Sequence, residues 1–156
     1  MRLHRSVPDA VRAVADRRLA WGVTTEGTVL VAAPTCLYVD GIPLPWIEVE
    51  KVGWVHPLLR LTEIAEVEGT GAVHLWELAE EHVLAETIRE RVTSSVGWSD
   101  VRTLTPAGAV RLVGRRVPGE DLLTWQVVWR ADTDPLDPLL QVQVAAHLEL
   151  LRKTIG

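Results

Sequence analysis

The chain has 156 residues, which is enough for one domain that buries roughly two thirds of its unfolded surface, and we predict a single domain over residues 1–156. A hydrophobic content of 47% and a charged content of 24% are ordinary for globular proteins and exclude disordered, coiled-coil and collagen-like classes. The formal net charge of −5 argues against a nucleic-acid partner, because affinity for phosphate backbones comes from clustered cations.

Cysteine content and hydropathy indicate the cellular compartment of the protein. Cys36 is the single cysteine, which excludes an internal disulfide and a cysteine metal cluster. No run of about 18 apolar residues occurs, and the N-terminal residues lack the apolar core of a signal peptide. We therefore expect a cytoplasmic protein without a membrane span. Most of the seven tryptophans are expected in the core. Because the number is high for one small domain, one or two of them could lie at a surface site.

The chain begins with a predicted helix and a series of strands. Residues 1–18 are expected to contain a short N-terminal helix with Pro8 in its first turn, where proline is favoured. Residues 19–24 and 28–33 alternate as strands do and are joined by a glycine-containing hairpin connection. A further strand covers residues 36–39.

The stretch 37–54 carries the strongest turn signals of the chain. Asp40 and Gly41 predict a tight hairpin turn, and two prolines restrict the backbone just before Trp46. From Trp46 onward apolar residues recur every three positions, which suits neither a regular strand nor a long helix. The spacing therefore indicates a corner or a bulge where the next strand begins.

The central part of the chain predicts more strands and then a helix. Three segments complete six consecutive antiparallel strands: residues 46–55, 58–67 and 72–78. Glu80 and Glu81 lie where the N-terminus of a following helix favours negative charge. The apolar stripe of this helix recurs every four residues, and Gly97 ends it; the stripe consists of Leu84, Ile88, Val92 and Val96.

The last third predicts a hairpin and a C-terminal helix. Residues 110–117 and 122–130 are strands joined by Pro118 and Gly119, which suit the centre of a type II turn. Asp137 is the expected N-cap of the final helix and Pro138 its first residue. The buried stripe of that helix is Leu140, Val144, Leu148, Leu151 and Ile155.

Two patterns carry a resemblance to known proteins. The order of six strands and a packed helix, with Ile-Pro-Leu-Pro-Trp-Ile-Glu-Val at residues 42–49, resembles bacterial pleckstrin-homology-like (PH-like) domains, in which such a Pro-Trp corner recurs. The longer pattern over residues 19–156 is similar to a family of uncharacterised actinobacterial proteins with a PH-like domain; it includes residues 89–95, 115–116, 125–128 and 137–138. The resemblance implies a fold and brings no activity, substrate or catalytic residue.

We therefore expect an α+β fold: an antiparallel, PH-like, partly closed β-barrel or sheet with a packed helix, an extra β-hairpin and a C-terminal helix. Within the single domain, residues 1–18 form the N-terminal helix, residues 19–97 the PH-like sheet and helix, and residues 98–156 the hairpin and C-terminal helix. The segment after Gly97 departs from a plain PH-like domain.

The candidate binding surface is a cationic patch on the last hairpin. Arginine binds carboxylate and phosphate through its fork and can lie over an indole face; the patch would combine Arg111, Arg115, Arg116 and Arg130 with Trp129. The alternative is a solvated strand end with ordinary charges. Residues 89–95 also offer arginines and hydroxyls, but they lie at the C-terminal end of a helix, where the dipole repels anions and hydroxyls bond the backbone instead.

Catalytic and metal signatures are weak in this sequence. A grouping of His and Glu has only loose metal spacing, whereas a zinc site needs three or four converging ligands; its members are His74, Glu77, His82 and Glu86. Asp132, Asp134 and Asp137 lack the glycine and distal Glu of a calcium loop, and helix capping explains them. No nucleophile or phosphate-loop motif occurs. We predict no catalytic residue, no metal ligand and no cofactor.

The resulting prediction is a non-enzymatic module that binds a protein partner or associates with itself. The alternative is a module for a small anionic ligand or a lipid headgroup, bound by the four arginines of the hairpin. A third reading, a cryptic hydrolase, requires a pocket with a hydroxyl or carboxylate next to His74 or His82.

Overall fold

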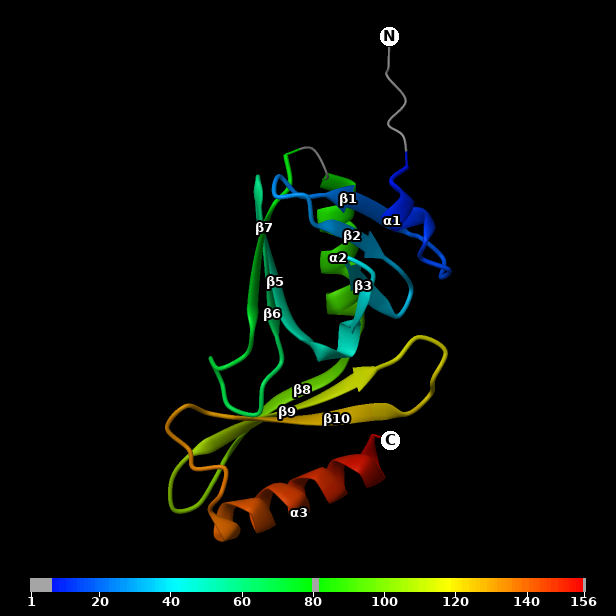
Figure 1. The fold of residues 1–156 in the computed structure, drawn as a ribbon. Coiled ribbons are helices and arrows are strands. Elements are labelled where there is room, and N and C mark those ends of the chain that lie inside the picture. Colours follow the sequence, from blue (N-terminus) through cyan, green and yellow to red (C-terminus); the bar gives the residue numbers. More distant parts are fainter. Residues whose placement is uncertain (1–6, 80–81, 156) are drawn as a thin grey trace.

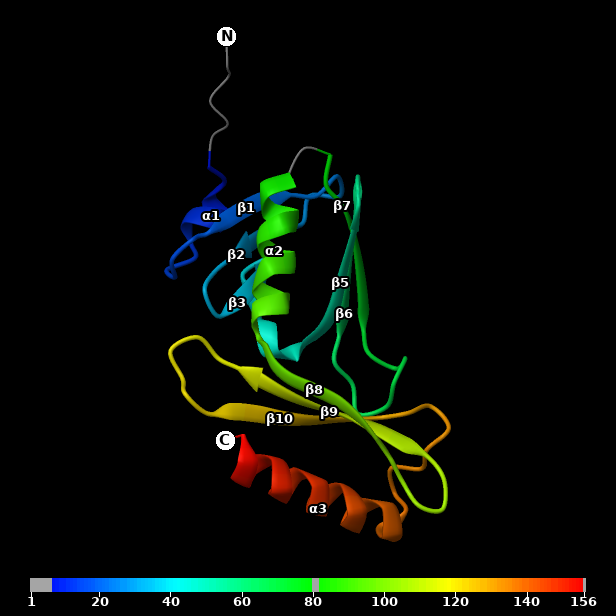
Figure 2. The ribbon, with the colours of Figure 1, turned by 180° about the vertical axis from the view of Figure 1, so that it is seen from behind.

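The computed structural model describes residues 7–79 and 82–155, which form helices and three antiparallel sheets, none of them closed. The α+β class is confirmed at this level. Figure 1 shows the third sheet between the N-terminal part of the molecule and the C-terminal helix, and Figure 2 shows the same layering from behind. In the described residues no helix is long and apolar enough to cross a membrane.

The first sheet is four-stranded, with the strands in chain order. Its strands are β1 (Ala20–Val23), β2 (Val29–Ala32), β3 (Cys36–Val39) and β4 (Ile42–Pro45). The turn between β3 and β4 is the predicted one: Asp40 and Gly41 have φ values of 48° and 83°, as a type I′ hairpin requires. The Asp40 carboxylate also accepts a hydrogen bond from the Val29 backbone N–H at 2.8 Å.

Strand β4 corrects the expected count of six strands. Residues 42–45 pair with β3 although they include Pro43 and Pro45. Because β4 is an edge strand, the missing N–H groups of these prolines interrupt no ladder on its free side. Seven strands therefore precede the central helix in the described residues.

Helix α1 (Asp9–Arg12) is a single turn, much shorter than the helix expected before residue 18. Only Val11 is buried on it, whereas Ala15 is exposed, so no apolar stripe continues the helix beyond its first turn. Pro8 precedes the helix as its N-cap. Residues 1–6 of the predicted N-terminal segment lie outside the described residues.

The second sheet begins at the predicted corner. A 3₁₀ turn, η1 (Trp46–Glu48), redirects the chain into three strands in chain order, β5 (Val49–Val55), β6 (Leu58–Glu63) and β7 (Val73–Glu77). A bulge follows between Val49 and Lys51. Both a corner and a bulge therefore explain the spacing of three in the sequence.

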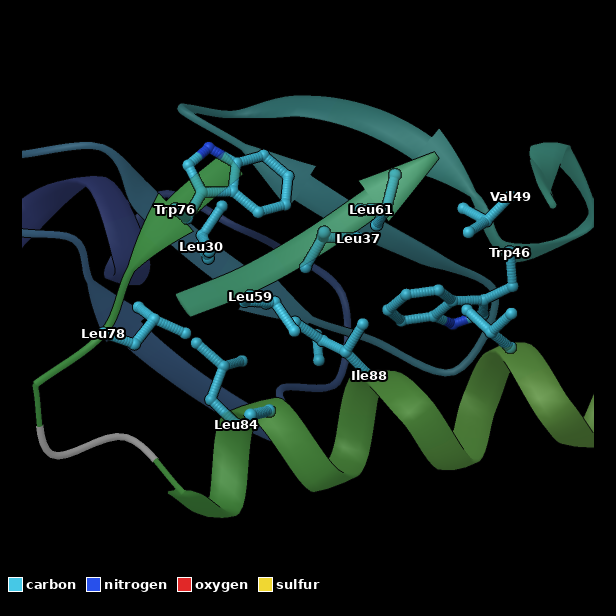
Figure 3. Close-up of a cluster of buried hydrophobic side chains, with 13 residues drawn as sticks. Leu30, Leu37, Trp46, Val49, Leu59, Leu61, Trp76, Leu78, Leu84 and Ile88 are labelled. Carbon is cyan, nitrogen blue, oxygen red and sulfur yellow. The ribbon is translucent and has the colours of Figure 1, made fainter. Parts of the chain in front are cut away.

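Helix α2 (His82–Ser94) packs the first core. Figure 3 shows Leu84 and Ile88 pointing from α2 into this core, with Leu59 above them and Trp46 toward the other end of the cluster from Leu84. The predicted stripe is correct for three of its four residues, but Val96 lies in the next strand and is 40% exposed. The helix ends earlier because the Ser95 hydroxyl donates to the Val92 carbonyl at 2.7 Å. Glu80 and Glu81 lie outside the described residues.

The third sheet has the order β10-β9-β8 and corrects the predicted hairpin. Its strands are β8 (Val96–Thr103), β9 (Ala109–Arg116) and β10 (Leu123–Trp129). Strand β8 escaped prediction because its residues are mostly exposed and its apolar residues do not alternate regularly with polar ones. A Cβ atom at Gly97 would lie 2.7 Å from a terminal methyl group of Leu123, so a larger residue there would require that side chain to shift.

Helix α3 (Pro138–Thr154) covers one face of the third sheet and encloses a second core. Asp137 is the predicted N-cap: its carboxylate accepts from the Leu139 N–H at 3.0 Å. The second core consists of Leu104, Val110, Leu112, Trp129, Leu140, Val144 and Leu151. It is separate from the core under α2, so side chains between the two cores decide how the third sheet is held.

Candidate functional site

The free face of the third sheet is turned toward the first core. Strand alternation places Val110 and Leu112 against α3, whereas Arg111 and Arg115 lie on the opposite face. On β10 the register pairs Val128 with Arg111, so Val128 belongs to the same face as the two arginines. The three predicted arginines of β9 therefore lie on two faces of the strand: Arg111 and Arg115 on the free face, and Arg116 on the opposite one.

Arg115 is inside the molecule and not on the predicted surface. Its side chain is 1% exposed. The guanidinium donates to the Trp46 carbonyl at 2.6 Å, to the Val49 carbonyl at 2.8 Å and to the Ser95 hydroxyl at 3.1 Å from Nε. Burial lowers the pKa of Arg115. Arg115 thus joins the third sheet to the corner at η1, which corrects its predicted role as a surface anion ligand.

Trp129 and Arg116 also depart from the predicted patch. Trp129 is 5% exposed in the core under α3, and its backbone pairs with the loop before β7: its N–H donates to the Glu66 carbonyl at 2.7 Å. Arg116 is exposed but lies on the other face of β9 from Arg115, since neighbouring strand residues point to opposite sides. This alternation was readable in the sequence and already argued against a patch containing both.

Arg111, Arg115 and Arg130 do meet, at a cavity of about 270 Å³ between the second and third sheets. Arg130 forms an ion pair with Glu68 at 3.4 Å, and the Arg111 guanidinium approaches the Ser99 hydroxyl at 3.5 Å. The remaining lining residues are Glu50, Lys51, Ile64, Val113 and Val128. Sequence reasoning missed Lys51, Ser99 and both glutamates, because only the packing of β5 over β9 brings them to the arginines.

His74 and His82 have different neighbours. His74 Nε2 lies 2.7 Å from the Glu63 carboxylate, and the His74 ring stacks on Trp76. His82 instead stacks on the ring of His56, with centroids 4.8 Å apart. No group of three or more His, Cys, Asp or Glu that could hold a metal ion occurs in the described part of the chain.

The outer side of α3 is a second candidate surface. Four apolar residues recur there at spacings of three and four, on the side away from the core; this outer stripe of α3 consists of Leu139, Val142, Ala146 and Leu150. Val142 is 68% and Leu150 63% exposed. In Figures 1 and 2 no other described element lies on that side of α3. The outer stripe of α3 is aliphatic. Of the tryptophans, all of which lie within the described residues, only Trp98 is exposed, and it is on β8.

Tyr38 is the only tyrosine, so its ionisation can be followed alone. The hydrogen bond with the Cys36 side chain, partial burial and the Asp16 carboxylate raise the pKa of Tyr38 to about 12. Because the pKa is raised above its unfolded value of about 10, the neutral phenol contributes stability that is fully present below that pH and is lost as pH rises toward the folded value.

We expect ultraviolet absorbance to show tyrosinate forming near pH 12 in the folded protein and near the unperturbed value in urea. Cys36→Ala should lower the folded pKa more than Asp16→Asn, since the Cys36 bond is the largest cause of the shift. An unshifted pKa in the folded protein would contradict this environment for Tyr38.

Comparison with known proteins found no match among protein-family models, curated proteins or solved structures.

Proposed function

We propose that this chain is a non-enzymatic binding module that associates with a second copy of itself through the outer stripe of α3. The stripe is the observation that carries the proposal. A surface helix normally has one apolar side, whereas α3 has a buried side facing the third sheet and a second apolar side facing solvent. An apolar helix side of this length is a site for a protein partner.

The stripe is suited to pairing with itself. In an antiparallel pair related by a two-fold axis at Ala146, Val142 of one copy lies opposite Leu150 of the other, and the reverse contact is the same. Ala146 at the crossing point allows the two helices to approach closely. Beside the stripe, Lys153 and Glu149 form an ion pair at 3.0 Å within the helix, so no uncompensated like charges face each other there.

For the N-terminal part we propose a PH-like domain. Three features support this assignment: a four-stranded sheet, a three-stranded sheet and the packed helix α2 follow one another in that chain order. The Pro-Trp corner at Pro45 and Trp46 lies between the first and second sheets, within the series of strands that precedes α2. The third sheet and α3 are then an addition that supplies the self-association surface.

A non-enzymatic role is supported by the separation of His74 and His82, the two histidines that a hydrolase site would have used. His74 and His82 have different neighbours, and neither lines the cavity that holds the arginines. The cytoplasmic location stays a prediction; a free, buried Cys36 suits a reducing compartment.

Val142→Glu should weaken self-association. A one-helix interface is small, so we expect a dimer with a dissociation constant on the order of micromolar, and a buried charge on each side of the two-fold axis should weaken it by at least about tenfold. Analytical ultracentrifugation over a wide protein concentration range measures this effect.

The matched control is Val55→Glu, which introduces the same charge at a valine that is 79% exposed in the second sheet. This variant should dimerise like the unmodified protein. A protein that stays monomeric at every concentration, or a dimer that tolerates Val142→Glu, would refute the proposed interface.

A further inference from the structure

The cavity between the second and third sheets is positively charged in an acidic chain. Its lining carries four cations, Lys51, Arg111, Arg115 and Arg130, but only two carboxylates, Glu50 and Glu68. The whole chain, in contrast, has 16 Lys and Arg against 21 Asp and Glu. Four cations around one cavity repel one another when the cavity is empty, and together they attract anions.

Arg115 gives the cavity wall a positive charge that no neighbouring carboxylate of the described residues neutralises. It is 1% exposed, and its hydrogen-bond acceptors are two carbonyls and a hydroxyl, which carry no net charge. In residues 7–79 and 82–155 no carboxylate forms an ion pair with it. Buried charges are normally compensated by an opposite charge. The positive charge of Arg115 is therefore available to an anion in the cavity.

The other cations have donors free for a ligand. Lys51 is exposed at the rim and forms no ion pair within the described residues. The Arg111 contact with the Ser99 hydroxyl is long, at 3.5 Å, and so is the Arg130 ion pair with Glu68, at 3.4 Å. Arg111 lies on β9 and Arg130 directly follows β10, whereas Lys51 comes from β5 of the second sheet. The donors thus approach one volume from two sides.

We propose that this cavity binds a phosphate monoester, with Arg111, Arg130 and Lys51 as its ligands and Arg115 as a fixed charge behind them. A dianion with oxygens in several directions matches donors that converge from two sheets, whereas one planar carboxylate meets a single fork. The volume of about 270 Å³ suits a small headgroup. The site is distinct from the outer stripe of α3.

Two probes separate a soluble from a membrane source of the phosphate. Glycerol 3-phosphate is titrated by calorimetry, and vesicles containing phosphatidate are tested by sedimentation, each against chloride at equal ionic strength. Binding of either probe that depends on Arg111 supports the proposal and identifies the source. No binding of either, or equal binding of succinate, overturns it.

Variants of opposite expected sign make the test specific. Arg111→Gln and Arg130→Gln should each weaken binding about tenfold through loss of a charge-assisted hydrogen bond. Glu68→Gln should instead strengthen it several-fold, because it removes a competing carboxylate from Arg130. Arg60→Gln is the control: Arg60 is exposed on β6, does not line the cavity, and should leave binding unchanged.

An Arg60→Gln loss as large as that of Arg111→Gln would show that general charge and not this cavity attracts the anion. Weaker binding by Glu68→Gln would overturn the role of Arg130 as a ligand for which Glu68 competes. Because α3 is not part of the cavity, Val142→Glu should bind the probes normally. The ligand site and the proposed dimer can therefore fail independently.

Discussion

Arg115→Ala is expected to lower the free energy of unfolding by about 3 kcal/mol. Truncation leaves the Trp46 and Val49 carbonyls without the donors that now lie 2.6 and 2.8 Å away. Each buried acceptor that loses its partner costs about 1–3 kcal/mol, and the vacated volume adds a cavity term. Release of the desolvated guanidinium charge offsets part of this loss. Urea denaturation measures the difference.

Arg116→Ala is the matched control for this change. Arg116 is the next residue on β9 but is exposed, so its truncation should alter stability by no more than about 0.5 kcal/mol. Arg115→Met adds a second comparison. Methionine fills much of the arginine volume but has no hydrogen-bond donor, so this variant loses the hydrogen bonds without leaving a large cavity. If Arg115→Ala were as stable as Arg116→Ala, the buried guanidinium would not hold the two sheets together.

Trp46→Ala should destabilise the protein by about 4 kcal/mol, the largest single effect that we expect. The indole is 1% exposed in the first core, and its N–H donates to the Ala33 carbonyl at 2.9 Å. Alanine removes the apolar contacts with the helix α2 side of the core and leaves this buried carbonyl unpaired. Thermal and urea denaturation should give the same order of variants.

Trp46→Phe separates the two contributions, because phenylalanine keeps most of the ring volume and loses the N–H donor. It should lose only part of the stability, about 1–2 kcal/mol. Trp98→Ala is the control at an exposed tryptophan and should lose less than about 1 kcal/mol. A Trp46→Ala variant no less stable than Trp98→Ala would contradict the proposed central place of the corner.

Local structure was predictable wherever neighbouring residues determine the backbone. The Asp40 and Gly41 turn, the Asp137 cap and most of the α2 stripe depend on interactions within a few positions along the chain. The candidate site was only partly predictable. Alternation tells which side chains share a strand face, so Arg111 and Arg115 could be grouped, and Arg116 could have been separated from them.

The element boundaries that failed are those without a local signal. Strand β8 is mostly exposed and its apolar residues do not alternate regularly with polar ones, so no apolar pattern marks it, and β4 contains prolines that argue against a strand unless its edge position is known. Helix α1 ended after one turn because only Val11 finds a place in the core. Each of these depends on what lies beside the element.

By itself, then, the sequence determined the Asp40 and Gly41 turn, the Asp137 cap, most of the apolar stripes of α2 and α3 and the α+β class, because these follow from short-range sterics and hydrogen bonding. Two predicted stripe residues were wrong: Val96 lies in β8, and Ile155 follows α3 and is 37% exposed. Only the tertiary structure decided what the free face of the third sheet meets. Packing of β9 under the corner at Trp46 buries Arg115, and packing of β5 over β9 brings Lys51 to Arg111. Such contacts join residues more than 50 positions apart, where no periodicity of the chain reports their distance.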